Sequence, residues 1–341
     1  MLPSMYSGIS GLKANQKKLD VVGNNIANAS TTAFKSQRIR FQDMISQNMS
    51  EAIGPGINTG GVNGKQIGLG VQIAGIDTTT SVGNMQPTSR LLDAAIDGSG
   101  YFVVSRGSLS EDANPKIALT DTYELTSGDD AADASSLNPF YTRDGSFTLD
   151  SQGNLLTSDG YRVLGYAISG ADIVYSTDPN TQATVGLHDA NDKDNPTAIL
   201  EKTLVPLVIP DKVGDERIQS FSIEKDGQIK AVTDKGKVAV LGQIAMASFK
   251  NDAGLKKLGK NLYEGSANSG SPLFRSGVGE ATETDNSKAY GDMLQGVLEM
   301  SNVDLAEQFT DMIIASRAFQ ANGKIISTGD EILQDLVNLK R

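Results

Sequence analysis

Apolar residues recur at alternating intervals of three and four at both ends of this 341-residue chain. The first stripe covers residues 5–26 and the second covers residues 305–337. This spacing places the side chains along one narrow line of an α-helix, as in helices that pair with other helices. The sequence therefore predicts helices over 5–28 and 301–339, about 36 Å and about 58 Å long, that pair as a coiled coil.

The large apolar members of both stripes form a predicted polymerisation seam. They are Met5, Ile9, Leu12, Leu19, Val22, Ile26, Leu305, Phe309, Met312, Phe319, Ile326, Leu333 and Val337. Ser316 and Gly323 lie on the same line and would let a partner backbone approach closely. Ser301 or Asn302 is expected to cap the second helix, with Asp304 near its positive end. Because an ordinary core face would be wider and shorter, we expect both helices to pack on each other and on neighbouring copies.

Between the helices the apolar pattern changes to a period of two, which is typical of β-strands. Asp-Gly dipeptides, which favour turns, separate many of these runs. The predicted strands are Ala74–Ile76, Tyr101–Val104, Phe147–Leu149, Arg162–Tyr166, Thr203–Ile209, Phe221–Ile223 and Val238–Phe249. Strands at this density predict antiparallel β-rich central domains of the sandwich or barrel kind. The fold class is thus multidomain, with α-helical ends and an all-β centre.

An internal repeat supports the β assignment. Residues 147–155 align without gaps on residues 221–229, and each segment is followed by a turn and by a Leu-Gly strand. We interpret them as two related hairpins of one domain, covering 73–170 and 218–299. Residues 171–217 would then form a small inserted outer domain, and residues 108–140 an exposed elaboration.

Seven glycines fall within residues 54–70 and predict a flexible connector. They are Gly54, Gly56, Gly60, Gly61, Gly64, Gly68 and Gly70. We expect them to form a hinge in a linker region over 34–72. This linker would join the β domain to a helical domain made of residues 1–33 and 300–341.

The charge of the chain bears on its partners. The formal net charge of −11 argues against nucleic acid, which needs a basic footprint. Residues 1–50 are an exception, with six basic and two acidic side chains. A basic arm for nucleic acid is one interpretation, and a solvated or partner-facing helix flank is the other and favoured one. No apolar run is long enough to span a membrane, and the first 20 residues lack the apolar core of a secretory signal.

Candidate reactive groups are few. The chain has no cysteine and one histidine, His188, which excludes a thiolate or multi-histidine metal site. The run Asp189–Asn195 lacks the glycine and glutamate positions of a calcium loop, and Gly64–Gln66 lacks those of a phosphate loop. We therefore predict no catalytic, cofactor-binding or metal-binding residue and no enzyme activity. A secreted β-rich enzyme or a monomeric binding module stays as the alternative class, and either would tolerate removal of residues 1–33 and 301–341.

Both ends of the chain resemble the signatures shared by flagellar rod, hook and hook-associated proteins. The matching segments are Ser7–Leu12, Asn24–Asn28, Thr32–Lys35, Leu298–Asp304, Arg317–Asn322 and Ile332–Gln334. The centre is similar to the β domain of the hook and distal-rod subfamily. Its matching segments are Leu92–Phe102, Tyr141–Phe147, Leu241–Ile244, Asn261–Tyr263 and Ser269–Gly270.

The resemblance implies a structural subunit that self-assembles into the flagellar hook, a flexible tube that transmits motor torque. Two features favour the hook: the ending Ile332–Arg341 looks hook-like, and the chain is longer than distal rod proteins usually are. A distal rod protein is the alternative. The implied partners are other copies, the distal rod protein, the hook cap protein, the hook–filament junction proteins and the flagellar type III export apparatus. The implied location is the extracellular flagellum, reached without a cleavable signal peptide, and no cofactor, nucleic acid or membrane insertion is implied.

Overall fold

The computed structural model describes residues 2–56, 60–107, 116–119, 137–168, 173–175, 182–186, 200–214, 216–275 and 291–339. Its contacts divide the chain into two compact units, each assembled from separate stretches of sequence. Unit 1 comprises Met1–Thr31, Lys35–Ser81 and Ser301–Arg341, and unit 2 comprises Thr32–Phe34 and Val82–Met300. His188, residues 189–195 and most of 108–140 lie outside the described residues, so the predictions made for them remain predictions.

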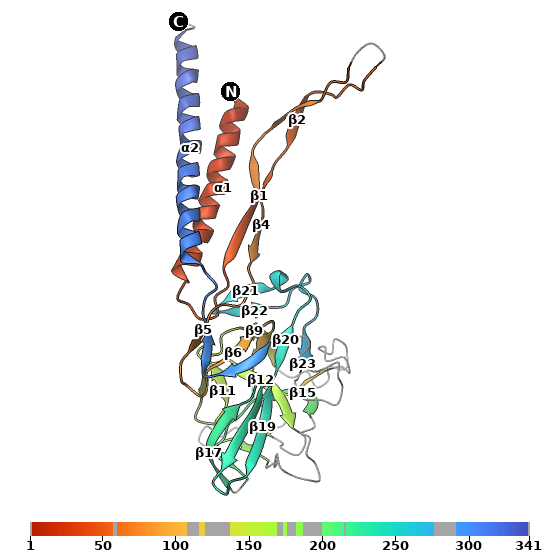
Figure 1. Ribbon diagram of the computed structural model, residues 1–341, viewed down its shortest axis with the longest axis vertical. Helices are drawn as coiled ribbons and strands as arrows, with labels where there is room; N and C mark the ends of the chain where they lie inside the picture. The colour runs from red at the N-terminus through yellow and green to blue at the C-terminus, as the bar shows by residue number, and fades with distance from the viewer. Residues whose placement is uncertain are drawn as a thin grey trace. The chain divides into compact units, whose positions relative to one another are not determined.

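Unit 1 contains the two helices, α1 (Leu2–Ala27) and α2 (Leu305–Asn338). They run antiparallel and side by side (Figure 1). The helices approach each other closely at Gly8 and Gly11, where an added Cβ would lie 3.4 Å from Ile326 Cγ1 and 2.7 Å from Asn322 Nδ2. The small residues that bring the backbones together thus lie on α1. Gly323 of α2 has open space around its Cα.

The start of α2 differs from the sequence prediction. Asp304 is the N-cap, and its carboxylate accepts hydrogen bonds from the backbone N–H groups of Ala306 and Glu307. Ser301 and Asn302 precede the helix. The Asn302 side chain instead accepts a hydrogen bond from Ser36 N–H and donates to the Thr79 carbonyl. Because Asn302 bonds outside the helix, the cap falls to the next acceptor along the chain.

Paired strands cover about half of the predicted linker region, residues 34–72. Strand β1 (Gln37–Asp43) pairs antiparallel with β4 (Val71–Thr78), and β2 (Ser46–Ser50) pairs with β3 (Lys65–Gly68). An isolated bridge between Ile53 and Val62 continues the ladder. We call this extended hairpin, residues 37–56 and 60–78, the arm (Figure 1). Most of the glycines predicted as a hinge lie beyond or between these ladders.

Unit 2 contains the remaining strands. They are β5 (Met85–Pro87), β6 (Ala94–Asp97), β7 (Tyr101–Arg106), β8 (Ile117–Ala118), β9 (Asn138–Thr142), β10 (Phe147–Leu149), β11 (Leu155–Thr157), β12 (Arg162–Ile168), β13 (Ile173–Val174), β14 (Thr184–Val185), β15 (Leu200–Pro206), β16 (Lys212–Val213), β17 (Glu216–Ile223), β18 (Gln228–Thr233), β19 (Val238–Ile244), β20 (Met246–Ser248), β21 (Lys256–Gly259), β22 (Leu262–Glu264), β23 (Leu273–Arg275), β24 (Asp292–Gln295) and β25 (Val297–Glu299). A short 3₁₀ turn covers Asp252–Gly254. Each of the seven runs predicted from the sequence overlaps one of these strands or β4, but Thr203–Ile209 continues past the end of β15 and Val238–Phe249 covers both β19 and β20.

Strand β12 organises unit 2, because it pairs antiparallel with β7, β11, β15 and β19. Two apolar clusters pack on the resulting sheets, one around Phe102 and Phe147 and the other around Tyr101 and Tyr166. Residues 204–209, from the C-terminal part of the predicted insertion, contribute to both clusters. Among the described residues, that stretch belongs to the same compact unit as the predicted β domain.

The internal repeat is confirmed as two matching hairpins, β10–β11 and β17–β18. Their tight turns place Gly153 and Gly227 at φ +84° and +85°. The turns that follow each hairpin place Gly160 and Gly236 at +80° and +77°. These backbone angles favour glycine strongly, which explains why both segments carry glycine in each turn, although the second turn comes two residues later in the second segment.

Candidate functional site: exposed surfaces of the helices and arm

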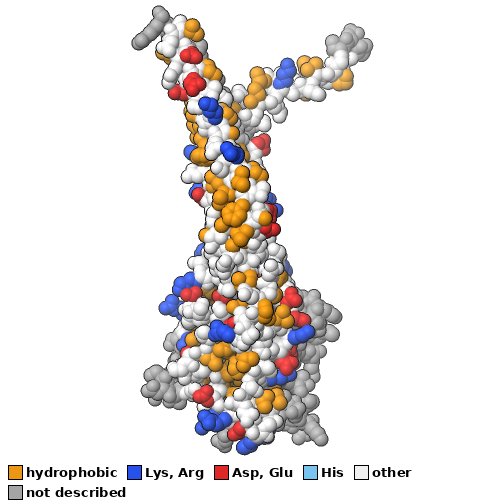
Figure 2. Space-filling model, turned by 60° about the vertical axis from the view of Figure 1, so that its left-hand side comes forward, with side chains coloured by type: hydrophobic (Ala, Val, Ile, Leu, Met, Phe, Trp, Pro, Cys, Tyr) orange, Lys and Arg blue, Asp and Glu red, His pale blue; other side chains and the backbone are white. Residues whose placement is uncertain are grey.

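Helix α2 leaves much of its apolar surface uncovered in a single copy of the chain. Phe309 is 50% exposed and Ile313 is 62% exposed. The exposed large apolar side chains of α2 are Leu305, Phe309, Ile313, Ile314, Phe319, Ile325, Ile332 and Val337, with Leu339 at its C-cap. Figure 2 shows hydrophobic side chains at the surface of the helical unit. Large apolar side chains exposed along a helix in this number mark an interaction site more often than a free surface.

The predicted seam lies partly inside the helix pair and partly outside it. Val22 is buried, whereas Met5, Leu12, Leu19, Ile26, Met312, Ile326 and Leu333 are half-buried. Ile9, Leu305, Phe309, Phe319 and Val337 are exposed. Residues spaced seven apart on a straight helix shift around its surface by about 20° per heptad. The seam residues of α2 therefore move gradually from the side away from α1 toward the side that packs on α1. The role of these residues in polymerisation stays a prediction.

The predicted seam does not include a second stripe of exposed apolar side chains on α2. This stripe is formed by Ile314, Ile325, Ile332 and Leu339. At about 100° per residue these side chains share one side of the helix, roughly opposite to Leu305 and Phe319. Their spacing of eleven, seven and seven residues was the signal available in the sequence. α2 therefore has an apolar flank on each side of the face that packs on α1.

Helix α1 packs on different neighbours with its two sides. Gly8, Gly11 and Lys18 face α2, where the Lys18 ammonium lies 3.0 Å from the Asp311 carboxylate. On the opposite side, the Ser10 hydroxyl accepts a hydrogen bond from Val71 N–H at 3.2 Å. A Cβ at Gly70 would collide with that hydroxyl. The predicted hinge residue Gly70 is therefore a contact point between the arm and α1.

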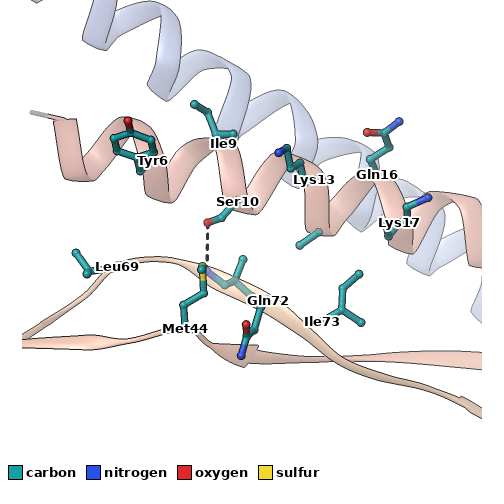
Figure 3. Close-up of a pocket in the computed structure, with 12 residues that line it drawn as sticks. Tyr6, Ile9, Ser10, Lys13, Gln16, Lys17, Met44, Leu69, Gln72 and Ile73 are labelled. Atoms are coloured by element: carbon teal, nitrogen blue, oxygen red, sulfur yellow. Dashed lines mark hydrogen bonds between the residues drawn. The ribbon is translucent and has the colours of Figure 1, made fainter.

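The arm and α1 enclose an open groove of about 520 Å³. Figure 3 shows the side chains that line it from both elements, with the Ser10 hydrogen bond crossing between them. The lining residues are Tyr6, Ile9, Ser10, Lys13, Ala14, Gln16 and Lys17 from α1, and Met44, Leu69, Val71, Gln72 and Ile73 from the arm. Its floor is mostly apolar, and Lys13 and Lys17 supply positive charge from α1.

Polar residues fix the base of unit 1, where α1, the arm and α2 meet. Asn25 is buried, and its side-chain amide donates to the Gln37 carbonyl and to Gln308 Oε1. Its side-chain oxygen accepts from Gln37 N–H. The buried Lys35 ammonium donates to the Ser81 carbonyl at 2.8 Å. Two of the signature segments, Asn24–Asn28 and Thr32–Lys35, therefore supply groups that hold three elements in one register.

Unit 2 has its own buried polar cluster. The Arg143 guanidinium lies 3.5 Å from the Glu299 carboxylate, and both side chains are almost fully buried. Arg143 also lies over the ring of Tyr101, 5.5 Å from its centroid. Burial raises the pKa of Tyr101 above its usual range and that of Tyr263 to about 12, so both phenols stay neutral at physiological pH. The cluster holds the signature segments Tyr141–Phe147 and Leu298–Asp304 together.

The described part of the chain contains no group of three His, Cys, Asp or Glu side chains placed to hold a metal ion. None of its described helices has the length and apolar character required to cross a membrane.

Three family models match the chain. They are described as "Flagella basal body rod protein" over residues 5–35, "Flagellar hook protein FlgE/F/G D1 domain" over residues 133–231, and "Flagellar basal body rod FlgEFG protein C-terminal" over residues 294–339. The first covers most of α1, the last covers β25 and α2, and the middle one covers the first hairpin of the repeat and all but the last two residues of the second.

Full-length relatives give the same result. The flagellar basal-body rod protein FlgG of Bacillus subtilis is 41% identical over 341 residues, covering 100% of both chains. The hook protein FlgE of Borreliella burgdorferi is 30% identical over 453 aligned positions, again covering 100% of both chains. A solved hook protein, FlgE2 of Helicobacter pylori, has a TM-score of 0.38 and 12% identity, covering 63% of this chain and 100% of that chain. That structural likeness is too low to carry an argument.

These relatives overturn the length argument for the hook. The rod proteins of Bacillus subtilis and Borreliella burgdorferi align over 341 and 345 positions, close to the length of this chain, whereas the hook proteins need 453 and 472. The alternative assignment, a rod protein, is therefore better supported than the hook. With relatives of this identity along its whole length, the chain belongs to the family of flagellar rod and hook proteins.

Proposed function

We propose that this chain is a polymerising subunit of the flagellar rod, at its distal part. The observation that carries the proposal is the full-length match at 41% identity to a rod protein of the same length. Hook relatives are less similar and require much longer alignments. The proposed role is structural, and no catalytic step forms part of it.

The exposed apolar surfaces of α2 support assembly into a polymer. A chain that remained alone would hold Phe309, Ile313 and their neighbours in water, at a cost of about 25 cal/mol per Å² of apolar surface. In a tube, copies on either side would cover both flanks. We therefore propose that α1 and α2 pair as a coiled coil in the inner layer, and that seam residues such as Phe319 contact neighbouring copies.

A rod assignment changes the expected neighbours. Other copies remain the main partner, and the hook protein becomes a neighbour along the axis. Contacts with the hook cap protein and the junction proteins followed from the hook hypothesis and do not follow from this one. Export through the flagellar type III apparatus, without a cleavable signal peptide, remains part of the proposal because it comes with the family resemblance.

The hinge hypothesis is narrower than the sequence suggested. Gly54, Gly56, Gly60 and Gly61 lie beyond the β2–β3 ladder, where only the Ile53–Val62 bridge is described. Any bending of the arm is therefore proposed for its outer end. Prolines at Gly54 and Gly60 would test this, since unchanged assembly and unchanged stiffness of the tubes would remove the hinge from the proposal.

The assignment is tested by deleting the gene in its host and imaging basal bodies by electron cryotomography. A rod subunit predicts basal bodies that end in a shortened rod without a hook. A hook subunit predicts a complete rod without a hook, and normal flagella would overturn both assignments. Expression of the intact chain from a plasmid should restore the missing part, whereas a chain lacking residues 301–341 should not.

A further inference from the structure

We propose that the groove between α1 and the arm binds the C-terminal tip of α2, residues 330–339, from a second copy of this chain. The proposal rests on the proposed function as a polymer subunit and names one of its contacts. It commits to a second copy because the tip and the groove complement each other in charge, length and apolar character.

Most of the tip is exposed in a single copy, and among its described side chains only Leu333 is half-buried. Met5 contacts α2 at Gly329, where an added Cβ would lie 3.3 Å from Met5 Cγ. α1 begins at Leu2, only three residues before Met5. The last turns of α2 therefore extend beyond the start of α1, as Figure 1 shows. Ile332 and Leu339 are exposed there, and Leu339 is 83% exposed. An isolated amphipathic end of this kind is only marginally stable without a packing partner.

The charges of the tip and the groove are opposite. Residues 330–339 contain three acidic side chains and no basic one. Within the described chain, Glu331 and Asp335 form no ion pair, and neither does Lys13 at the groove. Lys17 pairs only with the exposed Asp20 on its own helix.

The spacing of the charges also matches. Lys13 and Lys17 are four residues apart on α1, and Glu331 and Asp335 are four residues apart on α2. Residues at this interval lie on the same side of a helix, about 6 Å apart along its axis. Asp335 lies between Ile332 and Leu339 on the helix surface, as i+3 and i−4 neighbours. In the proposed contact, the apolar side chains of the tip pack in the apolar groove, and the two carboxylates of the tip lie beside the two ammonium groups of α1.

The lengths agree as well. The α1 side of the groove extends from Tyr6 to Lys17, about 17 Å of helix, and the tip of ten residues is about 15 Å long. An amphipathic helix in a hydrophobic groove is a common mode of recognition. The tip of the same copy cannot reach the groove, because α2 passes Gly8 at Ile326 and Leu339 lies about 20 Å further along the helix.

The first test uses charge reversal in the full-length chain, with polymer measured by sedimentation and electron microscopy. Lys13→Glu with Lys17→Glu, or Glu331→Lys with Asp335→Lys, should each raise the concentration needed for polymer about tenfold at low salt. Combining all four substitutions should restore polymerisation. Lys324→Glu, on α2 but outside the tip, is the matched control. If the combined variant is as defective as its parents, the charge pairing is wrong.

The second test does not depend on charge, and it uses the absence of cysteine from the chain. A variant with Gln72→Cys and Leu339→Cys should form disulfide-linked oligomers on oxidation, whereas Gln72→Cys with Lys324→Cys should not. Polymer without these oligomers would overturn the docking and leave the proposed function standing. If neither polymer nor oligomers form while the chain is folded by circular dichroism, the polymer function itself fails.

Discussion

The two units of the chain differ in how far they bury their large apolar side chains. In unit 2, Phe102, Phe147 and Phe274 are completely buried, and Phe102 and Phe147 meet edge to face with ring centroids 5.1 Å apart. In unit 1, Phe309 and Phe319 are exposed, and the described core of the helix pair consists largely of small residues such as Ala14 and Ala315. Unit 2 therefore stabilises itself, whereas unit 1 depends on contacts from outside the single chain. Substitutions of the same chemical kind should have different consequences in the two units.

The largest expected effect is on assembly and comes from unit 1. Phe309→Asp or Phe319→Asp should abolish polymer, because a carboxylate would have to be buried between copies at a cost of several kcal/mol. The free energy of unfolding of unit 2, measured by urea titration, should not change. Lys324→Asp introduces a carboxylate at an exposed position of α2 that, at about 100° per residue, lies between the two stripes, and it should still polymerise. Normal polymer from Phe319→Asp would mean that this stripe is not an interface.

The next effect is on stability and comes from unit 2. Phe102→Ala should lower the free energy of unfolding by about 3–5 kcal/mol, because it removes a fully buried ring and leaves a cavity. The matched substitution in unit 1, Phe41→Ala on the exposed arm, should cost less than about 1 kcal/mol. Urea denaturation of both variants measures the difference, and equal losses would contradict the contrast between the units.

A smaller effect concerns the start of α2. Asp304→Ala removes the acceptor for the N–H groups of Ala306 and Glu307 and should destabilise the helix by about 1 kcal/mol. Asp304→Asn keeps an acceptor and should lose much less. Amide hydrogen exchange in the first turn of α2 is the appropriate measurement. Exchange as slow as in the unmodified chain would show that packing, and not the cap, holds this end.

The smallest effect is a pH dependence within unit 2. Hydrogen bonding to Thr233 and the nearby Lys235 and Lys237 hold the pKa of Glu216 below its usual value of 4.5. Because the folded-state pKa is the lower one, the stabilisation is present above pH 4.5 and is lost as the pH falls through the folded-state value. The free energy of unfolding of Glu216→Gln should therefore fall less steeply on acidification. Parallel curves for the two proteins would contradict this assignment.

The elements that the sequence predicted well are those with a single dominant period. The heptad stripes located both helices to within about four residues, and the alternating runs located seven of the strands of unit 2: β7, β10, β12, β15, β17, β19 and β20. The repeat was predictable because its glycines occupy turns with positive φ, a requirement that is local and visible in sequence.

The arm was predicted poorly because its glycines masked a weaker alternation. Ile39 and Phe41 alternate with polar residues in β1 and face β4 through the pairs Ile39–Ile76 and Phe41–Ile73. An exposed two-stranded hairpin buries little apolar surface and therefore needs few apolar residues. Its alternation of apolar and polar residues is then hard to distinguish from the sequence of a loop. The N-cap was also missed, because the hydrogen bonds that occupy Asn302 come from residues more than 200 positions away in sequence.

The candidate site was predictable only in part for the same reason. Leu305, Phe309 and Phe319 were identified from their spacing, but the groove depends on the register of the arm against α1, which Ser10 and Gly70 set. Neither residue belongs to a periodic pattern that indicates this contact. Rod and hook could not be separated from motifs they share, and the length of full-length relatives was the deciding information.

The assembly of unit 1 from both ends of the sequence has a consequence for timing. α1 lies at the start of the chain and packs on α2, which lies at the end. During synthesis, one helix is always available before the other. Unit 2 is encoded almost continuously between them and can form its core before α2 has been made. The surface of unit 1 that we propose for polymerisation is therefore complete only when both ends of the chain are present, so that an incomplete molecule would lack it.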